Sequence, residues 1–333
     1  MRLRRERLHG REFVVFRPIV LPLRSRGDSA RVSAPLYRRQ LRTLVDRLGL
    51  RDGVVLTGDS RPGIVGAARE RLSGYIVKDW IYDDAQLLGR KPGELVRERD
   101  EICSSVDFVL AISSSLQTSL QAEGIQSRLL RHGFHGDLAS AYEREPPPEY
   151  RGLPAPRIVF AGRVDGRLDI GKLTATARHF SQGSVVMIGP VSPRVSGAEL
   201  GALRGEPNIH LLGARPREEL PPYLAHADCL LIPYRRSVWA HHGSPLKLWD
   251  YLYAGPPIVG SGYSVLSEYA PLVRFADDDA DFVNEVAEAL LDSGGREERR
   301  SFALANTWDE RGREFEQILR AANGSPTDED RRS

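Results

Sequence analysis

The strongest constraint on the fold is an alternation, along most of the chain, of short apolar runs with longer amphipathic stretches. Short runs rich in β-branched residues are typical of strands buried on both faces, and the stretches between them are typical of helices that cover a parallel sheet. In the first half, this pattern predicts helices over Ala34–Leu48, Pro92–Cys103 and Leu116–Glu123, and strands over Phe13–Leu23, Val54–Gly58, Tyr75–Asp79, Phe108–Ser113 and Ser127–Arg131.

A proline-rich break separates this half from a second one. Tyr142–Arg157 contains three consecutive prolines, which favour a stiff, extended conformation, so we expect an interdomain linker there. Beyond it, the pattern predicts strands over Arg157–Ala161, Ser184–Ile188, Asn208–Leu212, Cys229–Pro233, Pro257–Val259 and Val273–Phe275. Helices are predicted over Asp169–Phe180, Ala198–Leu203, Arg217–His226, Pro245–Ala254, Asp279–Leu291 and Glu297–Ala321.

These elements predict an α/β protein with two doubly wound domains. We place the domains at residues 1–145 and 146–323, followed by a disordered polar tail over 324–333. Ligands of such sheets bind in the crevice outside the carboxyl ends of the strands. We therefore expect the two domains to face a cleft that contains the functional site.

The composition bears on compartment and partners. Cys103 and Cys229 each lie in an apolar run, which indicates buried thiols in a reducing compartment. No apolar stretch approaches the roughly 18 residues that a membrane-spanning helix needs, and the basic start has no signal-peptide core, so we expect a cytoplasmic protein. A net charge of +2 gives no case for a nucleic-acid partner. Arginines outnumber acids over residues 1–50, which indicates a solvated surface or peripheral contact with the inner membrane face.

The segment Ser244–Gly260 is the strongest functional motif. Ser244 is a candidate N-cap and Pro245 suits the first position of a helix, whose free amides and positive dipole end would bind a diphosphate. Lys247 adds a positive charge one turn later, and Asp250 could accept hydrogen bonds from ribose hydroxyls. The structural alternative is an ordinary capped helix that leads into a buried strand.

Three other motifs have weaker interpretations. Gly166–Leu173 is close to a phosphate-binding P-loop but has leucine where magnesium binding needs Ser or Thr; Lys172 or Arg167 could still neutralise a diphosphate. Asp277–Asp279 matches an Asp-x-Asp metal signature, yet its place between a strand and a helix favours helix capping. His241 and His242 have no Cys or acid at ligand spacing, so no metal site is predicted.

The motif at Ser244–Val259 resembles the donor-binding segment of GT-B glycosyltransferases, in particular the family-4-type (group 1) enzymes of bacterial polysaccharide and glycolipid assembly. The resemblance covers roughly Val14 to Leu319 and implies two Rossmann-like domains, the second of which binds a nucleotide sugar. The other segments that carry it are Ile76–Trp80, Glu101–Ser115, Arg131–His135, Arg157–Arg163, Ser184–Pro190, Pro207–Gly213 and Glu218–Tyr234.

The resemblance also implies roles for single residues. The donor diphosphate would be approached by Gly162 and Arg163 and held from the helix start by Ser244, Leu246 and Lys247. In the family a glutamate that binds ribose usually stands at the position of Asp250, and an earlier acid often stands at that of His242. The histidine leaves the donor-sugar contacts and the stereochemistry open.

The first domain departs further from the family pattern. The segment Phe13–Pro18 resembles the family's second strand, and only a basic stretch precedes it. We therefore expect this domain to lack the family's first strand and glycine-rich turn. Asp79 ends a predicted strand at the cleft rim and is our candidate catalytic base for an inverting enzyme, with Asp83 and Asp84 close behind. A retaining enzyme needs no such base.

Together these features predict a metal-independent glycosyltransferase that needs no cofactor. It would move a sugar from a nucleotide-diphosphate donor to a hydroxyl of a glycan, a lipid-linked glycan or a small-molecule secondary metabolite. Two alternatives stay open. One is a nucleotide-sugar 2-epimerase on the same fold. The other is a non-catalytic partner subunit that binds sugar nucleotides, which the short first domain suggests.

Overall fold

The computed structural model describes residues 2–8, 11–17, 28–50, 53–58, 65–66, 70–77, 92–292 and 294–323. The chain forms two compact units. The first comprises residues 1–112, 116–130 and 315–333, and the second comprises residues 113–115 and 131–314. The boundary therefore lies at Leu130/Arg131, before the expected one after Glu145, and the end of the chain returns to the first unit.

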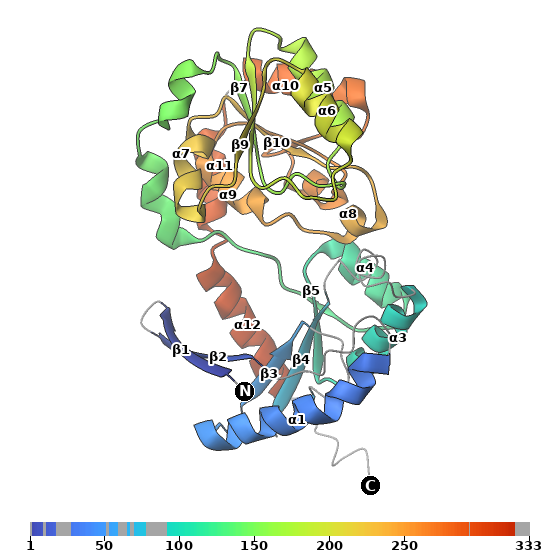
Figure 1. The fold of residues 1–333 in the computed structure, drawn as a ribbon. Helices are drawn as coiled ribbons and strands as arrows, with labels where there is room; N and C mark the ends of the chain where they lie inside the picture. Colours follow the sequence, from blue (N-terminus) through green and yellow to red (C-terminus); the bar gives the residue numbers. More distant parts are fainter. Residues whose placement is uncertain are drawn as a thin grey trace. The chain divides into compact units, whose positions relative to one another are not determined.

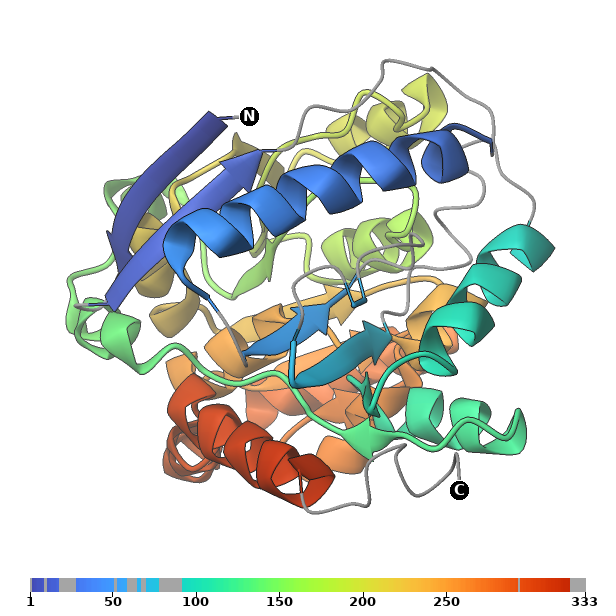
Figure 2. The ribbon, with the colours of Figure 1, turned by 90° about the horizontal axis from the view of Figure 1, so that it is seen from below.

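The first unit contains a parallel sheet with strand order β3-β4-β5-β6. Its strands are β3 (Val54–Thr57), β4 (Leu72–Val77), β5 (Phe108–Ala111) and β6 (Arg128–Leu129), and its helices include α1 (Asp28–Leu48), α3 (Pro92–Cys103) and α4 (Ser114–Ala122). A separate antiparallel hairpin, β1 (Arg2–Leu8) and β2 (Arg11–Arg17), precedes them (Figure 2). The strand predicted over Phe13–Leu23 is thus part of a hairpin, and the basic start that precedes it is the hairpin's other strand.

All four side chains of β5 are buried because apolar groups cover both faces of this sheet. Val109 and Ala111 pack in a cluster with residues of α3 and α4. Phe108 and Leu110 point to the other face, where they pack against helix α12 (Trp308–Asn323), with the rings of Phe108 and Phe315 6.1 Å apart (Figure 1). An uninterrupted apolar strand is the expected pattern for the interior of a parallel sheet.

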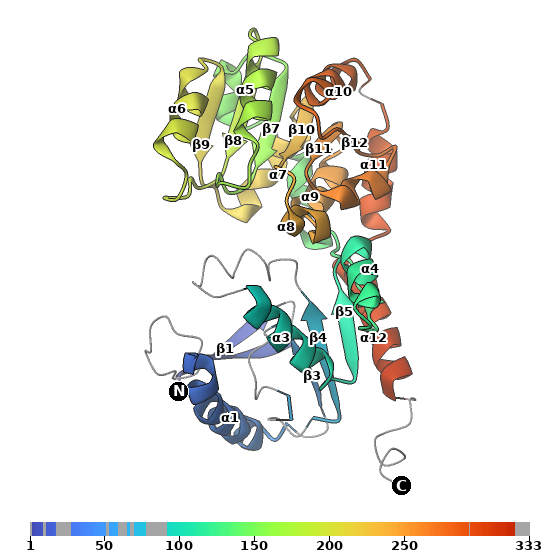
Figure 3. The ribbon, with the colours of Figure 1, turned by 90° about the vertical axis from the view of Figure 1, so that its right-hand side faces the viewer.

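The second unit contains a six-stranded parallel sheet with strand order β12-β11-β10-β7-β8-β9. The strands are β7 (Arg157–Ala161), β8 (Ser184–Ile188), β9 (Ile209–Gly213), β10 (Cys229–Pro233), β11 (Ile258–Ser261) and β12 (Arg274–Phe275). Helices α5 (Ile170–His179), α6 (Gly197–Gly205) and α10 (Asp279–Leu291) cover one face (Figure 3). Helices α7 (Leu220–Ala225), α9 (Lys247–Ala254) and α11 (Arg296–Leu304) cover the other, and the short helix α8 (Val238–His242) follows β10.

The proline-rich segment is part of the second unit and not an extended linker. It contains the 3-10 helices η1 (Gly136–Glu143) and η2 (Pro148–Gly152). Tyr142 and Tyr150 are buried in the core of the unit, and the Tyr150 hydroxyl donates a hydrogen bond of 2.7 Å to the carbonyl oxygen of Tyr223. Burial of these two rings outweighs the extended preference of the prolines between them.

The single helix predicted over Glu297–Ala321 is two helices, α11 and α12, with a break before Trp308. At the break the backbone pairs with another segment: Phe134 and Thr307 form a parallel bridge. The Phe134 amide donates to the carbonyl oxygen of Asn306 at 2.9 Å, and the Trp308 amide donates to that of Phe134 at 3.0 Å. These long-range hydrogen bonds replace the ones that a continuous helix would make.

Candidate functional site

The second sheet has one topological switch point. The chain builds β7, β8 and β9 toward one edge and then returns to build β10, β11 and β12 toward the other, so β7 and β10 are neighbours. The helices that follow these two strands, α5 and α9, cover opposite faces of the sheet, and the loops before them pair through an isolated bridge between Leu168 and Tyr234. In open parallel sheets such a switch point is where ligands bind. Gly162 follows β7, and Tyr234 follows β10.

Gly162 lies directly against the side chain of Lys247, the first residue of α9. A β-carbon built at Gly162 would lie 2.4 Å from Lys247 Nζ, and the φ angle of Gly162 is +153°. Any larger residue at this position would therefore have to displace the ammonium group. This close approach joins two residues that the sequence assigned to the diphosphate.

The ammonium group of Lys247 is enclosed by aromatic side chains. Its Nζ donates to the Tyr234 hydroxyl at 2.9 Å and lies 4.0 Å from the ring centroid of Phe160 and 4.9 Å from that of Tyr234. Among the described residues, no carboxylate lies within ion-pair distance of it. The pKa of Lys247 is lowered to about 7, chiefly by burial and also by repulsion from Arg167, against the attraction of Asp165. An anionic ligand would stabilise the charged form of an ammonium group in these surroundings.

The loop after β7 contributes two arginines with different surroundings. Arg167 forms an ion pair with Asp165, with 2.6 Å between Nη2 and Oδ2. Burial opposes ionisation of Asp165, but the hydrogen bonds from Arg167 outweigh it, so the pKa of Asp165 is lowered. Arg163 is exposed, and within the described part of the chain its guanidinium makes no ion pair. Arg163 is therefore the arginine of this loop that is available to a ligand.

The start of α9 differs from the predicted one. The cap residue is Leu246, the helix opens at Lys247, and no side chain caps it. The carbonyl oxygen of Pro245 accepts a hydrogen bond from the Leu248 amide at 3.0 Å, and this tight turn delays the helix. Ser244 is buried ahead of the turn, so its prediction as the N-cap was wrong. Within the described hydrogen bonds, the amides of Leu246 and Lys247 donate to no protein group, so both can bind a ligand.

Asp250 lies one turn further along α9 and is half-buried. Its Oδ1 lies 3.6 Å from Arg217 Nη2 and 3.5 Å from the Tyr142 hydroxyl. Burial raises the pKa of Asp250, and the charge of Arg217 opposes that effect. The carboxylate retains lone pairs for a further donor, such as a ribose hydroxyl.

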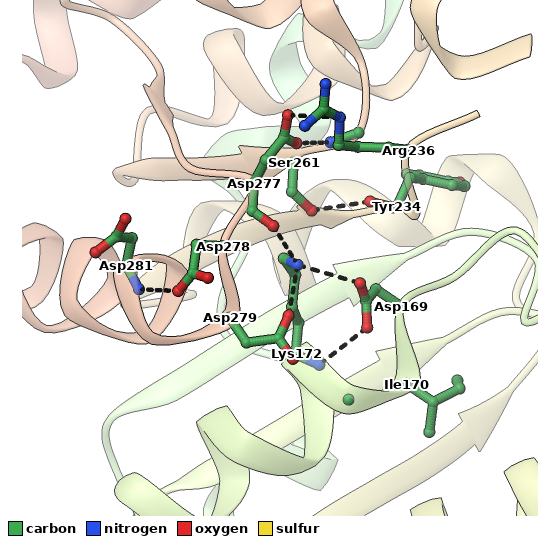
Figure 4. A network of polar contacts seen from close by, with 12 residues as sticks. Asp169, Ile170, Lys172, Tyr234, Arg236, Ser261, Asp277, Asp278, Asp279 and Asp281 are labelled. Atoms are coloured by element: carbon green, nitrogen blue, oxygen red, sulfur yellow. Dashed lines mark hydrogen bonds and ion pairs between the residues drawn. The ribbon is translucent and has the colours of Figure 1, made fainter. Parts of the chain in front are cut away.

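Lys172 is not brought to this site, although the sequence predicted it as a donor-binding residue. Its ammonium group lies 3.1 Å from Asp169 Oδ2, 2.7 Å from Asp279 Oδ1 and 2.7 Å from the carbonyl oxygen of Asp277 (Figure 4). These contacts use all three of its donors, and its side chain is 4% exposed. Lys172 therefore joins α5 to the start of α10 instead of facing a ligand.

The aspartates at residues 277–279 have separate structural roles. Asp278 caps α10, as predicted, by accepting hydrogen bonds from the amides of Ala280 and Asp281 (Figure 4). Asp277 accepts from the Gly262 amide at 2.8 Å and lies 3.4 Å from Arg236. Among the described residues, no three acidic, histidine or cysteine side chains are grouped so that they could hold a metal ion.

Asp79, the candidate base, lies outside the described residues, so its role stays a prediction.

The aromatic enclosure of Lys247 by Phe160 and Tyr234 was missed by the sequence analysis. The available signal was an aromatic residue directly after β10, because that position faces the crevice at a switch point.

Comparisons with known proteins show what this chain is similar to. Residues 155–292 match the family model of the group 1 glycosyl transferases. A protein of Bacillus subtilis (strain 168), assigned to teichuronic acid biosynthesis as the glycosyltransferase TuaH, is 25% identical over 225 residues. That match covers 65% of this chain and 55% of the relative, so the chain spans little more than half of that protein.

Two solved structures show the same fold. Sucrose-phosphate synthase of Thermosynechococcus elongatus superposes with a TM-score of 0.72 and 18% identity, over 94% of this chain and 84% of that one. HepE of Anabaena, solved with UDP and glucose, has a TM-score of 0.65 and 14% identity, over 89% and 83% of the two chains. Residues 155–292 of the second unit therefore match a group 1 glycosyl transferase domain, in a chain that has the GT-B fold.

Proposed function

We propose that this protein transfers a sugar from a nucleotide-diphosphate donor to an acceptor hydroxyl. The observation that carries the proposal is the ammonium group of the half-buried Lys247, which lies against Gly162 and two aromatic rings without an acidic partner among the described residues. A diphosphate would supply the missing negative charge. The structure of HepE with UDP and glucose shows a protein of this fold with a nucleoside diphosphate and a sugar.

The proposed donor site is built from backbone and side-chain groups. The amides of Leu246 and Lys247 and the Lys247 ammonium bind the diphosphate at the start of α9, and Arg163 approaches it from the loop after β7. Asp250 accepts hydrogen bonds from the ribose. These cationic and amide donors stabilise the charge that develops on the leaving diphosphate. The proposed transfer requires no metal, so activity should be retained after dialysis against a chelator.

The acceptor in this proposal is a hydroxyl of a glycan, a lipid-linked glycan or a small molecule. Asp79 remains our candidate for the base that removes the proton of that hydroxyl in an inverting reaction. Asp79→Asn should then lower kcat by at least about a hundredfold while leaving donor affinity unchanged. An unchanged kcat would remove Asp79 from the mechanism.

The donor assignment is tested by ligand binding. Thermal unfolding is measured with UDP-, GDP-, ADP- and TDP-sugars, since a ligand at a hundredfold excess over its Kd stabilises the folded state by about 2.7 kcal/mol. Lys247→Ala should abolish most of the stabilisation by the best ligand. Arg178→Ala is the control. This exposed arginine lies in the last turn of α5, away from the loop after β7, and pairs with Glu206. Equal stabilisation of the wild type and of Lys247→Ala would overturn the proposed site.

We also propose that the protein works in the cytoplasm, with peripheral contact to the inner membrane face through α1. Arg38, Arg39, Arg42 and Arg47 are exposed on this helix, whereas Leu44 and Val45 are buried. Juxtaposed arginines attract anionic lipid head groups. No helix in the described part of the chain is both long and apolar enough to span a bilayer.

The membrane proposal has its own test. The wild type should sediment with vesicles rich in phosphatidylglycerol at low salt and not with pure phosphatidylcholine vesicles. Replacing Arg38, Arg39 and Arg42 together by glutamine should remove this binding, whereas an equal number of substitutions in exposed arginines of the second unit should not. Sedimentation that is insensitive to the α1 substitutions would exclude α1 as the contact.

A further inference from the structure

Three arginines of α11 bind the carboxyl end of α9, the helix whose amino end forms the proposed donor site. Arg300 Nε donates to the carbonyl oxygen of Tyr253 at 3.2 Å, and Arg296 Nη1 donates to that of Ala254 at 2.8 Å. Arg299 Nε donates to that of Gly255 at 2.8 Å. We call Arg296, Arg299 and Arg300 the arginine clamp. Three successive carbonyl groups thus receive three cations from one neighbouring helix.

The end of α9 is shaped to admit this clamp. Gly255 has a φ of +95°, and its amide donates to the carbonyl oxygen of Tyr251. A β-carbon at Gly255 would lie 2.6 Å from Cγ of Arg296. Only glycine therefore allows both the left-handed turn and the passage of Arg296. The last carbonyl groups of a helix have no partner inside it and carry partial negative charge, which the clamp satisfies.

Arg299 is the central member of the clamp and is 6% exposed. Its second contact is a hydrogen bond of 2.6 Å from Nη2 to the carbonyl oxygen of Gly294. No carboxylate in the described part of the chain lies within ion-pair distance of it, and burial, with repulsion from Arg296, lowers its pKa. A buried guanidinium is costly unless the surrounding oxygens compensate its charge. Here the compensation comes from the end of α9, so the two helices are held in one axial register.

An aromatic contact also packs α9 against α11. The indole of Trp249 stacks on the ring of Phe302 of α11, with centroids 6.2 Å apart and planes 3° apart. Trp249 lies two residues after Lys247, so a shift of α9 along α11 would move the Lys247 ammonium with it. A displacement of about 1 Å at a binding group is enough to cost substantial function.

We propose that the arginine clamp positions α9 so that the Lys247 ammonium group meets the donor diphosphate. This inference rests on the proposed function of that site. The three arginines are positioning residues, since they lie at the opposite end of the helix from the ligand. A neighbouring helix thereby determines how strongly the donor is held.

The test uses inorganic pyrophosphate as the probe, titrated calorimetrically into the full chain. Arg299→Gln should weaken pyrophosphate binding by about tenfold, within the range known for residues that act at a distance through packed elements. Arg299→Lys retains the charge but not the planar fork, so it should recover part of the loss. Arg311→Gln is the matched control. Arg311 is also buried, at 9% exposure, but its guanidinium contacts Asn306 and Glu314 and not α9.

A double-mutant cycle separates positioning from a general loss of stability. If the clamp acts through Lys247, the effect of Arg299→Gln on pyrophosphate affinity should largely disappear in a Lys247→Ala background. An equal loss in both backgrounds, or an equal loss in Arg311→Gln, would overturn the inference. If Lys247→Ala itself leaves the affinity unchanged, the donor site is wrong, and this outcome is distinct from a failure of the clamp.

A milder variant covers the case in which Arg299→Gln does not fold. Arg300→Gln removes one hydrogen bond to Tyr253 and an ion pair with Glu143. It should increase amide hydrogen exchange over residues 248–254, whereas Arg311→Gln should not. Unchanged exchange in α9 together with unchanged pyrophosphate affinity would show that the clamp does not hold this helix.

Discussion

The ammonium nitrogen of Lys247 lies 2.9 Å from the hydroxyl oxygen of Tyr234, and this contact joins the start of α9 to the end of β10. The hydroxyl is a neutral acceptor, so it does not offset the cost of burying a charge as a carboxylate would. The surroundings of Lys247 therefore favour its neutral form, and a bound anion would favour its charged form. Two of our predictions follow from this relationship.

The first prediction concerns the pH dependence of stability. The pKa of Lys247 in the folded protein is about 7, below the ordinary value of 10.5, so the unfolded state binds more protons between these two values. Charged Lys247 lowers the free energy of unfolding, and this destabilisation is fully present below pH 7. It decreases as the pH rises toward 10.5. Relative to Lys247→Met, the wild type should gain up to about 1.4 kcal/mol per pH unit in this window.

Urea unfolding of the wild type and of Lys247→Met at pH 6.5, 8 and 9.5 measures this gain. The difference between the two proteins isolates Lys247 from the other groups that titrate in this range. A difference that stays constant with pH would mean that Lys247 has an ordinary pKa.

The second prediction concerns proton uptake on ligand binding. A bound diphosphate stabilises the charged amine and raises its pKa, so pyrophosphate should bind more weakly as the pH rises above 7. Calorimetry at pH 7.5 in buffers of different ionisation enthalpy should detect a fraction of a proton taken up per pyrophosphate bound. The uptake should be smaller in Lys247→Met, where the pyrophosphate still titrates but the lysine does not. Uptake of the same size in that variant would assign the proton to another group.

The third prediction concerns the contact between Gly162 and Lys247. A methyl group at residue 162 would collide with the ammonium group at 2.4 Å, and the side chain can swing away because it is flexible. Gly162→Ala should therefore fold but lose at least about tenfold in pyrophosphate affinity. Gly166→Ala, in the same loop, is the control, since a β-carbon there has no neighbour within 4 Å. Equal affinities for the two variants would place the diphosphate elsewhere.

Local sequence patterns predicted the parts of the fold that local interactions determine. All six strands of the second sheet lie where apolar runs predicted them, and the central strands β8, β10 and β7 are apolar because they are almost fully buried. The cap at Asp278 was also predicted, since a cap bonds only the next few amides. In contrast, the break before Trp308 comes from a bridge to Phe134, far away in the sequence.

Sequence motifs named candidate site residues but could not show the partners of their side chains. Lys172 was assigned to the diphosphate from a near match to a P-loop, and Lys247 from its place one turn into a predicted helix. Their difference lies in their partners: Asp279, which binds Lys172, lies in a helix more than a hundred residues later. Phe160 and Tyr234, which enclose Lys247, come from two strands that only the folded sheet makes neighbours. The spacing of residues along the sequence shows neither the ion pair of Lys172 nor the aromatic enclosure of Lys247.

The fourth prediction follows from the contacts of Lys172. Replacing it by methionine leaves the carboxylates of Asp169 and Asp279 beside each other without a cation. Because Asp279 is 63% exposed, the cost should be smaller than for a fully buried ion pair, about 1–3 kcal/mol in urea unfolding. Pyrophosphate affinity, extrapolated to the folded fraction, should be unchanged, because Lys172 lies in the junction of α5 and α10 and not at the switch point. Stability equal to the wild type, or a loss of affinity as large as that of Lys247→Ala, would contradict this assignment and return Lys172 to the donor site.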